Sequence, residues 1–484
     1  MTQSPSLFEQ FRATIQTDNI ISDLTNGLIG HHATFSGPLG SKPLLYADYV
    51  ASGRALRQVE DFVLTELLPF YANSHTEASY VGRFMTRLRR EARDIIRTEV
   101  NASKDHAVIF TGSGATAGIN RLAHLICIKE MVAKGQTPVV LIGPYEHHSN
   151  ILPWRESGAE VIEVPEAKGG GPCETALSQT LDRVKGRPIV GAFSAASNVT
   201  GIVTDVVAIT RILKAAGAIV VWDYAGGAPY LPIDLCPADD ALIDAVVVSP
   251  HKFVGGPQAT GVLILRHEIV QTNIPTLPGG GTVRFVSPTR HDYSDNVETR
   301  EEAGTPNVIG DLRAALCFIV KSVITQDFIC TRNRENLTRG LSAWMPHPNI
   351  EILGNTQCDR LPIFSFRLRD GKGGFVHQQL VTRLLSDCFG IQARGGCACA
   401  GPYVHRVLDI SENASDAMRS EILSGNEIEK PGFVRLNFSY LATDAEVSRI
   451  ISAVLELADS AGDHVDDYSC DPATAIFNPR EGVN

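Results

Sequence analysis

The sequence predicts an α/β protein built on a mostly parallel, doubly wound β-sheet. Short apolar runs rich in β-branched residues, typical of buried strands, alternate with amphipathic runs at helical spacing. Polar residues directly follow several of the apolar runs, which is where such a sheet binds its ligand. The predicted strands are residues 107–110, 138–142, 161–164, 189–194, 218–222, 246–248 and 260–265.

The composition is that of a globular protein with an acidic balance. Of the 484 residues, 44% are hydrophobic and 20% are charged, and the formal net charge is −11. This charge provides no basic surface for nucleic acid, and no apolar run reaches membrane-spanning length. The first residues show no signal-peptide pattern, and the ten cysteines are scattered singly except for Cys397 and Cys399. We therefore expect a protein of the reducing cytoplasm.

The stretch from Val246 to Pro257 joins the end of a predicted strand to a Gly-Gly-Pro turn. It contains Ser249, His251 and Lys252. A lysine at the mouth of a sheet is poorly hydrated, which favours the neutral amine that Schiff-base chemistry requires. The neighbouring hydroxyl and imidazole can donate hydrogen bonds to an anion. An ordinary surface lysine at a strand end is the alternative.

A second apolar run, residues 218–222, ends at Asp223. A carboxylate at a strand end, one strand away from a lysine, suits a pyridoxal phosphate site, because it keeps the pyridine nitrogen protonated. From about residue 45 to 457 the chain resembles the class V aminotransferase family, which includes the cysteine desulfurases. The resemblance implies that pyridoxal 5'-phosphate is the cofactor, with Lys252 as the Schiff-base lysine and Asp223 as the partner of the pyridine nitrogen.

The resemblance also implies the type I fold of pyridoxal phosphate enzymes. This fold has a mostly parallel seven-stranded sheet flanked by helices and a smaller α+β C-terminal domain. We expect an N-terminal extension over residues 1–44 that joins the small domain, a large cofactor-binding domain over 45–334, and a small domain over 335–484. A polar insertion at about 403–431 within the small domain is a candidate lid.

The run Thr111-Gly-Ser-Gly-Ala-Thr116 links a predicted strand to a helix that runs to about residue 128. Backbone N–H groups at a helix N-terminus form a cradle for an anion. Together with the Ser-Pro-His-Lys stretch, this turn predicts a phosphate site. Its members are Gly114, Ala115, Thr116, Ser249 and His251. A simple tight turn is the alternative.

Two further polar residues follow predicted strands. A flat imidazole at such a position can stack on a cofactor ring and move protons. The resemblance assigns this role to His147 rather than to His148, and it assigns Asn198 to the phenolic oxygen of the cofactor and to the substrate side. His75, in a loop that resembles the substrate-side loop of the family, is a weaker candidate that is equally well explained as structural.

The loops 278–282 and 302–307 resemble family loops that reach the phosphate of a neighbouring subunit, with Thr305 as the contact. The resemblance therefore implies a homodimer with shared sites. Two flexible Gly-rich loops are the alternative.

Near the C-terminus, Cys399 stands five residues after Arg394, the spacing that the persulfide-forming desulfurases show. A thiol near cationic groups attacks as thiolate. Arg394 and Arg435 are candidates for the substrate carboxylate, because a guanidinium matches it bidentately. Cys397 is either a second thiol or a packed residue. An inert Cys399 is also possible on the sequence alone.

Four local expectations complete the prediction. Residues 7–21 form one amphipathic piece, and Arg83, Arg87, Arg90, Arg93 and Arg97 make the solvated face of a helix. Asp444 caps the last long helix, and the final twenty or so residues form a loose tail.

The function implied is that of a pyridoxal phosphate-dependent transferase or lyase of the cysteine desulfurase type. Sulfur leaves L-cysteine as a persulfide on Cys399, alanine is released, and His147 or Lys252 moves protons. A sulfur-acceptor protein is an expected partner, and no metal site is expected. The alternative is an aminotransferase, epimerase or β-eliminating lyase for another amino acid, with Cys399 a bystander. A sulfur-relay protein whose main role is docking is a third hypothesis.

Overall fold

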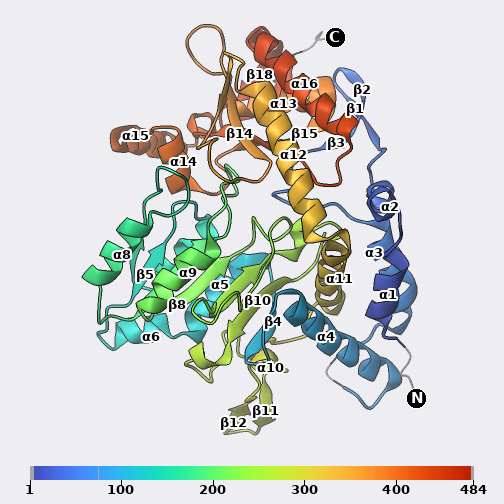
Figure 1. Ribbon diagram of the computed structural model, residues 1–484, viewed down its shortest axis with the longest axis vertical. Coiled ribbons are helices and arrows are strands. Elements are labelled where there is room, and N and C mark those ends of the chain that lie inside the picture. Colours follow the sequence, from blue (N-terminus) through green and yellow to red (C-terminus); the bar gives the residue numbers. More distant parts are fainter. Residues whose placement is uncertain (1–4, 75, 481–484) are drawn as a thin grey trace. The chain divides into compact units, whose positions relative to one another are not determined.

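A computed structural model describes residues 5–74 and 76–480 of the chain (Figure 1). Two compact units are present. The large unit comprises Met1–Ile29, Ser52–Ala195 and Thr204–Gln326, and the small unit comprises Gly30–Ala51, Ala196–Val203 and Asp327–Asn484.

The large unit is built on a seven-stranded sheet with the order β4-β10-β9-β8-β7-β5-β6. Only β10 runs antiparallel to its neighbours, which confirms the predicted mostly parallel sheet. The strands are β4 (His106–Gly112), β5 (Val139–Ile142), β6 (Glu160–Glu163), β7 (Ile189–Ser194), β8 (Ile219–Asp223), β9 (Ala245–Val248) and β10 (Gly261–Arg266).

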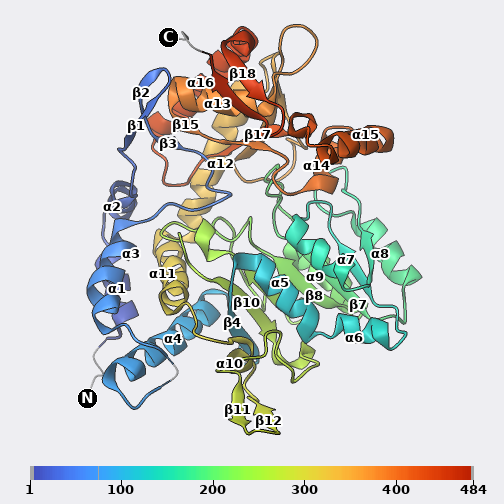
Figure 2. The same cartoon turned by 180° about the vertical axis from the view of Figure 1, so that it is seen from behind.

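Helices cover both faces of this sheet (Figure 1, Figure 2), which is why its strands are apolar without alternation. A Cβ on Gly118 of α5 (Gly114–Leu125) would lie 2.9 Å from Val247, so this helix packs closely on one face. On the other face Trp222 donates a hydrogen bond of 2.9 Å to Thr210 of α9 (Val206–Ala215). Asp205 caps α9 by accepting a hydrogen bond from the amide of Ala208.

The other helices and strands of the large unit surround this core. They are α1 (Leu7–Ile15), α2 (Ile20–Gly27), α3 (Arg57–Phe62), α4 (Tyr80–Glu99), α6 (Ile128–Ala133), α7 (Leu152–Glu156), α8 (Glu174–Arg183), β11 (Val283–Val286), β12 (His291–Tyr293), α10 (Val297–Glu301) and α11 (Val308–Ile324). The predicted piece 7–21 is thus two helices. The first of them is closed by a capping box between Ser6 and Glu9.

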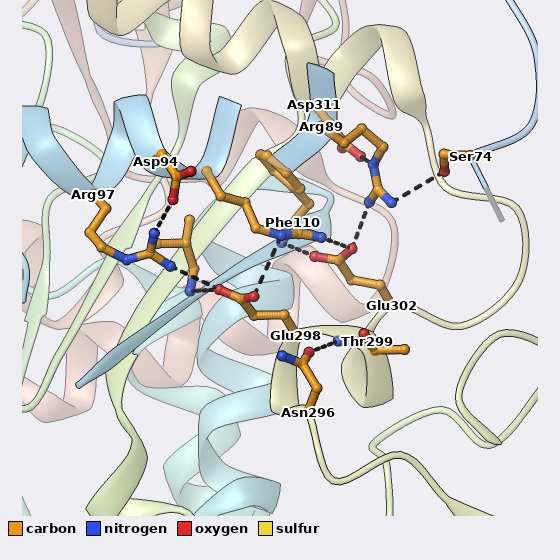
Figure 3. A network of polar contacts seen from close by, with 12 residues as sticks. Ser74, Arg89, Asp94, Arg97, Phe110, Asn296, Glu298, Thr299, Glu302 and Asp311 are labelled. Carbon is orange, nitrogen blue, oxygen red and sulfur yellow. Dashed lines mark hydrogen bonds and ion pairs between the residues drawn. The ribbon is translucent and has the colours of Figure 1, made fainter. Parts of the chain in front are cut away.

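The edge strand β4 has its outward amides occupied by two carboxylates (Figure 3). Glu298 accepts from the amide of Val108 at 2.9 Å, and Glu302 accepts from the amide of Phe110 at 2.8 Å. An exposed edge strand invites pairing with another chain. Glu298 and Glu302 therefore accept the hydrogen bonds that a neighbouring strand would otherwise accept from β4.

The arginines of α4 neutralise those carboxylates, so the predicted solvated face is only partly correct. Arg83, Arg87 and Arg90 are exposed. Arg93 and Arg97, however, pair with Glu302 and Glu298. A buried residue that the charge pattern did not single out, Arg89, contacts Glu302 at 2.6 Å and Asp311 at 2.8 Å (Figure 3). Buried charges persist only when paired, and sequence spacing does not reveal partners so distant in the chain.

The small unit contains a four-stranded antiparallel sheet with the order β13-β14-β17-β16. Trp344, Phe364, Phe366 and Phe438 form an aromatic cluster in its core. The elements are β13 (Ile350–Ile352), β14 (Ile363–Leu368), β16 (Arg394–Gly396), β17 (Phe433–Asn437), α12 (Gln326–Trp344), α13 (Gln378–Phe389), α14 (Gly401–Val407), α15 (Glu412–Leu423) and α16 (Asp444–Ser460). Short pairs are formed by β1 (Thr34–Gly37) with β2 (Gly40–Pro43), and by β3 (Leu45–Tyr46) with β15 (Ile391–Gln392).

Two of the local predictions in the small unit are wrong. Thr443, not Asp444, caps α16, because its hydroxyl and Glu446 form a capping box. The expected loose tail contains a hairpin of β18 (Tyr468–Asp471) and β19 (Ile476–Pro479). The reason is Tyr468, which is buried in the small-unit core and donates a hydrogen bond to Asp387.

The hairpin should therefore contribute to stability. Replacing the buried ring in Tyr468→Ala is expected to lower the free energy of unfolding by about 3 kcal/mol, the cost of a large-to-small core change. Tyr468→Phe, which loses only the hydrogen bond to Asp387, should cost about 1 kcal/mol. Urea denaturation measures both. An alanine variant as stable as the wild type would mean that the hairpin does not pack as described.

Candidate active site

Two strand ends of the large unit bring Asp223 and Lys252 close to each other. Asp223 is the last residue of β8 and lies opposite Val247 of β9, whose continuation leads through a 3₁₀ turn to Lys252. The carboxyl accepts a hydrogen bond of 2.7 Å from the amide of Ala225. Burial raises the pKa of Asp223, while that hydrogen bond and the charge of Lys252 oppose the rise. The site thus holds a buried acid beside an amine.

The predicted phosphate residues lie together at the start of α5. Ser249 accepts from the amide of Ala115 at 3.0 Å. Gly114 has a φ of +62°, and a Cβ there would come within 2.9 Å of the Ser249 hydroxyl and 3.1 Å of the His251 ring. Only glycine leaves this cradle open. Burial lowers the pKa of His251 to about 4, so its ring is neutral at physiological pH.

His147 follows β5 and caps a 3₁₀ turn, His148–Asn150. Its Nδ1 accepts from the amide of Ser149 at 3.1 Å and lies 3.0 Å from the Ser149 hydroxyl. That hydroxyl is 2.7 Å from Oγ1 of Thr116, the remaining predicted phosphate residue. A hydrogen-bonded path therefore joins His147 to the cradle.

Glu146 is a buried residue of this region that sequence reasoning missed. Its carboxyl accepts hydrogen bonds from the amides of Gly143 and Ser194, the hydroxyl of Ser194 and the side chain of Asn150. Burial outweighs these donors and raises its pKa to about 7. The sequence pattern that could have indicated Glu146 is an acidic residue a few positions after a wholly apolar strand.

In the small unit, Arg394 and Arg435 lie directly opposite each other on β16 and β17. Like charges at opposed positions repel, and the carboxylate of Asp48 contacts both guanidinium groups. Its oxygens are 2.9 Å from Nε of Arg394 and 2.8 Å from Nη2 of Arg435. Arg435 is buried, whereas the side chain of Arg394 is 53% exposed. The sequence did not predict that Asp48 bridges these two arginines.

The loop between β16 and α14 carries Cys399. Its side chain is exposed, and both Ala398 and Cys399 have left-handed backbones, with φ of +50° and +55°. Two such residues in a row are strained, and strain of this kind concentrates at functional sites. Asn198 holds the loop by donating to the carbonyl of Ala398 at 2.8 Å. Its buried Oδ1 accepts no hydrogen bond within residues 5–74 and 76–480.

Thr305 and His75 are the remaining candidates. Thr305 is exposed in the loop after α10, and His75 lies outside the described residues.

The cysteines, Cys397 and Cys399 included, are all free thiols. Within the described ranges, no three His, Cys, Asp or Glu side chains are arranged to hold a metal ion. None of the helices described is long and apolar enough to cross a membrane.

Comparison with known proteins gives a family for this arrangement. The model of the family "Aminotransferase class-V" matches residues 45–450. The chain belongs to the class V aminotransferase family. Members of this family use pyridoxal phosphate, and the predicted resemblance is confirmed.

Relatives with curated names are cysteine desulfurases. A cysteine desulfurase of Pectobacterium atrosepticum is 30% identical over 376 residues, covering 76% of this chain and 86% of the relative. A probable cysteine desulfurase of Streptomyces coelicolor is 28% identical over 370 residues, covering 75% and 85%.

Solved structures support the fold. The apo cysteine desulfurase of Thermococcus onnurineus aligns with a TM-score of 0.71 at 23% identity, over 86% of this chain and 95% of that one. A cysteine desulfurase of Escherichia coli aligns with a TM-score of 0.68 at 23% identity, over 95% and 100%. The predicted type I fold is therefore confirmed.

Glu146 provides a pH-dependent test of the large-unit site. Its pKa of about 7 in the folded chain exceeds the ordinary value of 4.5, so the folded state holds the proton more tightly. The resulting stabilisation is complete below pH 4.5 and is lost as the pH rises through 7. Relative to Glu146→Gln, the wild type should lose about 3 kcal/mol of unfolding free energy over this window. The exposed Glu174→Gln is the control, and a pH-independent difference between wild type and Glu146→Gln would contradict the assignment.

Proposed function

We propose that this protein is a pyridoxal phosphate-dependent cysteine desulfurase, which takes sulfur from L-cysteine as a persulfide on Cys399 and releases alanine. The observation that carries the proposal is the buried carboxyl of Asp223 close to the half-buried Lys252, beside an open anion cradle. The names of its relatives support the choice of reaction within the family.

The residues of the large unit fit the cofactor in three respects. Lys252 supplies the amine for the covalent link, and Asp223 supplies a buried carboxyl for the pyridine nitrogen. The cradle of Gly114, Ala115, Thr116, Ser249 and His251 matches a phosphate, because a side chain at Gly114 would fill it. When bound, pyridoxal phosphate serves as an electron sink for the amino-acid substrate.

Further residues complete the proposed binding. The ring of His147 would lie against the cofactor. The buried Oδ1 of Asn198, which accepts no hydrogen bond from the described residues, has the capacity for a polar partner, and this fits its proposed contact with the phenolic oxygen. Thr305 would serve the phosphate of a partner subunit in a homodimer. Arg394 and Arg435, already oriented by Asp48, would hold the substrate carboxylate.

Cys399 performs the sulfur transfer in this proposal. Its thiolate forms a bond to the sulfur of the substrate as the carbon–sulfur bond breaks. The electron pair of the broken bond stays with carbon, which takes a proton and leaves as alanine, so that one thiol becomes one persulfide. Because Cys399 is exposed on its loop, the persulfide would be accessible to a sulfur-acceptor protein. Ten free thiols fit a cytoplasmic location.

Sulfide and alanine release from L-cysteine tests this function. Cys399→Ala is expected to lower the rate at least about 100-fold, the usual cost of losing a nucleophile's chemistry, and to abolish the persulfide seen by mass spectrometry. Cys330→Ala removes another exposed thiol of the small unit and should leave the rate unchanged.

Two results would contradict the proposal in different ways. If wild type binds the cofactor but releases neither product from L-cysteine, the substrate is another amino acid. If Cys399→Ala retains the wild-type rate, Cys399 is a bystander and the chemistry is that of a lyase without a persulfide.

A further inference from the structure

Both the backbone amide and the hydroxyl of Ser149 contact Nδ1 of the His147 ring. The amide hydrogen of Ser149 points at Nδ1 of His147 across 3.1 Å, and the Ser149 hydroxyl lies 3.0 Å from the same nitrogen. The His147 ring thereby caps the 3₁₀ turn, His148–Asn150. Nδ1 is thus the acceptor of a backbone hydrogen bond.

This contact selects one form of the imidazole. A neutral ring has one nitrogen that carries hydrogen and one that accepts. If Nδ1 carried the hydrogen, that hydrogen would meet the amide hydrogen of Ser149. The geometry therefore places the hydrogen on Nε2. The Ser149 hydroxyl is compatible with this form, because it can donate either to Nδ1 or to Thr116 at 2.7 Å.

The segment that carries Ser149 has little freedom to turn its amide away. Glu146 holds the start of the segment to β7 through the amide and hydroxyl of Ser194. Asn150 holds the end through Glu146 and the carbonyl of Ala192, and its amide donates to the carbonyl of His147 at 2.8 Å. The side chain of Asn150 is also bound by Trp154. These contacts fix the backbone on both sides of the ring.

We infer that Ser149 is a positioning residue that keeps His147 as a neutral hydrogen-bond donor through Nε2, so that Lys252 rather than His147 accepts protons in the reaction. The inference rests on the proposed function for the roles of both residues. It resolves the choice that the sequence left open between them. A histidine that stays neutral and keeps one N–H can act as a hydrogen-bond donor that polarises its partner.

Nitrogen NMR of protein labelled with ¹⁵N-histidine tests the tautomer directly, with or without cofactor. The resonances of residue 147 are identified by their loss in His147→Gln, and His148→Gln is the matched control. We expect a protonated Nε2 and an unprotonated Nδ1 at neutral pH. A protonated Nδ1, alone or together with Nε2, would overturn the inference. This measurement does not depend on turnover, so it separates a failure of the inference from a failure of the proposed function.

Two substitutions test the chemical role of the ring. Glutamine can place an N–H where Nε2 lies but cannot take up a proton, whereas phenylalanine keeps a flat ring without a donor. We expect the turnover number of His147→Gln to stay within about tenfold of wild type, and that of His147→Phe to fall by about 100-fold or more. The pH profile of His147→Gln should keep the wild-type shape. Equal losses in both variants, or a missing limb in that profile, would assign proton transfer to His147.

Discussion

The carboxyl of Asp223 is buried at the end of β8, where the amide of Ala225 and the charge of Lys252 act against the cost of burial. An isolated buried carboxylate is unfavourable in a folded protein, so the ends of β8 and β9 must stay in register. The parallel pairing of these strands provides that register. The cradle at Gly114 depends on the same geometry, because Ser249 follows β9 and binds the first turn of α5.

Carboxylates that do not belong to the proposed chemistry hold this sheet in place. Glu146 ties the loop after β5 to β7, and Glu298 and Glu302 complete the open edge of β4. The arginines of α4 form ion pairs with Glu298 and Glu302 (Figure 3). In the small unit, Asp48 has a similar role between Arg394 and Arg435. Acidic side chains thus hold the backbone of the large-unit sheet and orient the two arginine side chains of the small unit.

The sequence reveals features that arise within one element or at one strand end. Apolar runs predict the seven strands, and the residues after them predict Lys252, Asp223 and the cradle, because parallel strands share a carboxyl edge. Pairs formed across the chain leave no such pattern. Arg89 contacts Glu302 more than two hundred residues later in the chain. Helical spacing alone shows on which face of a helix a side chain lies, not which distant residue it contacts. The C-terminal hairpin was missed for the same reason, since Tyr468 is anchored by the distant Asp387.

The proposed function depends most on Lys252 as the proposed site of covalent attachment of pyridoxal phosphate. Reduction of the cofactor-loaded protein with borohydride, followed by peptide mass spectrometry, locates the attachment directly. We predict a single pyridoxyl group on the peptide that contains Lys252, and its loss in Lys252→Ala. A pyridoxyl group on another lysine, or no modified peptide after incubation with the cofactor, would contradict the account.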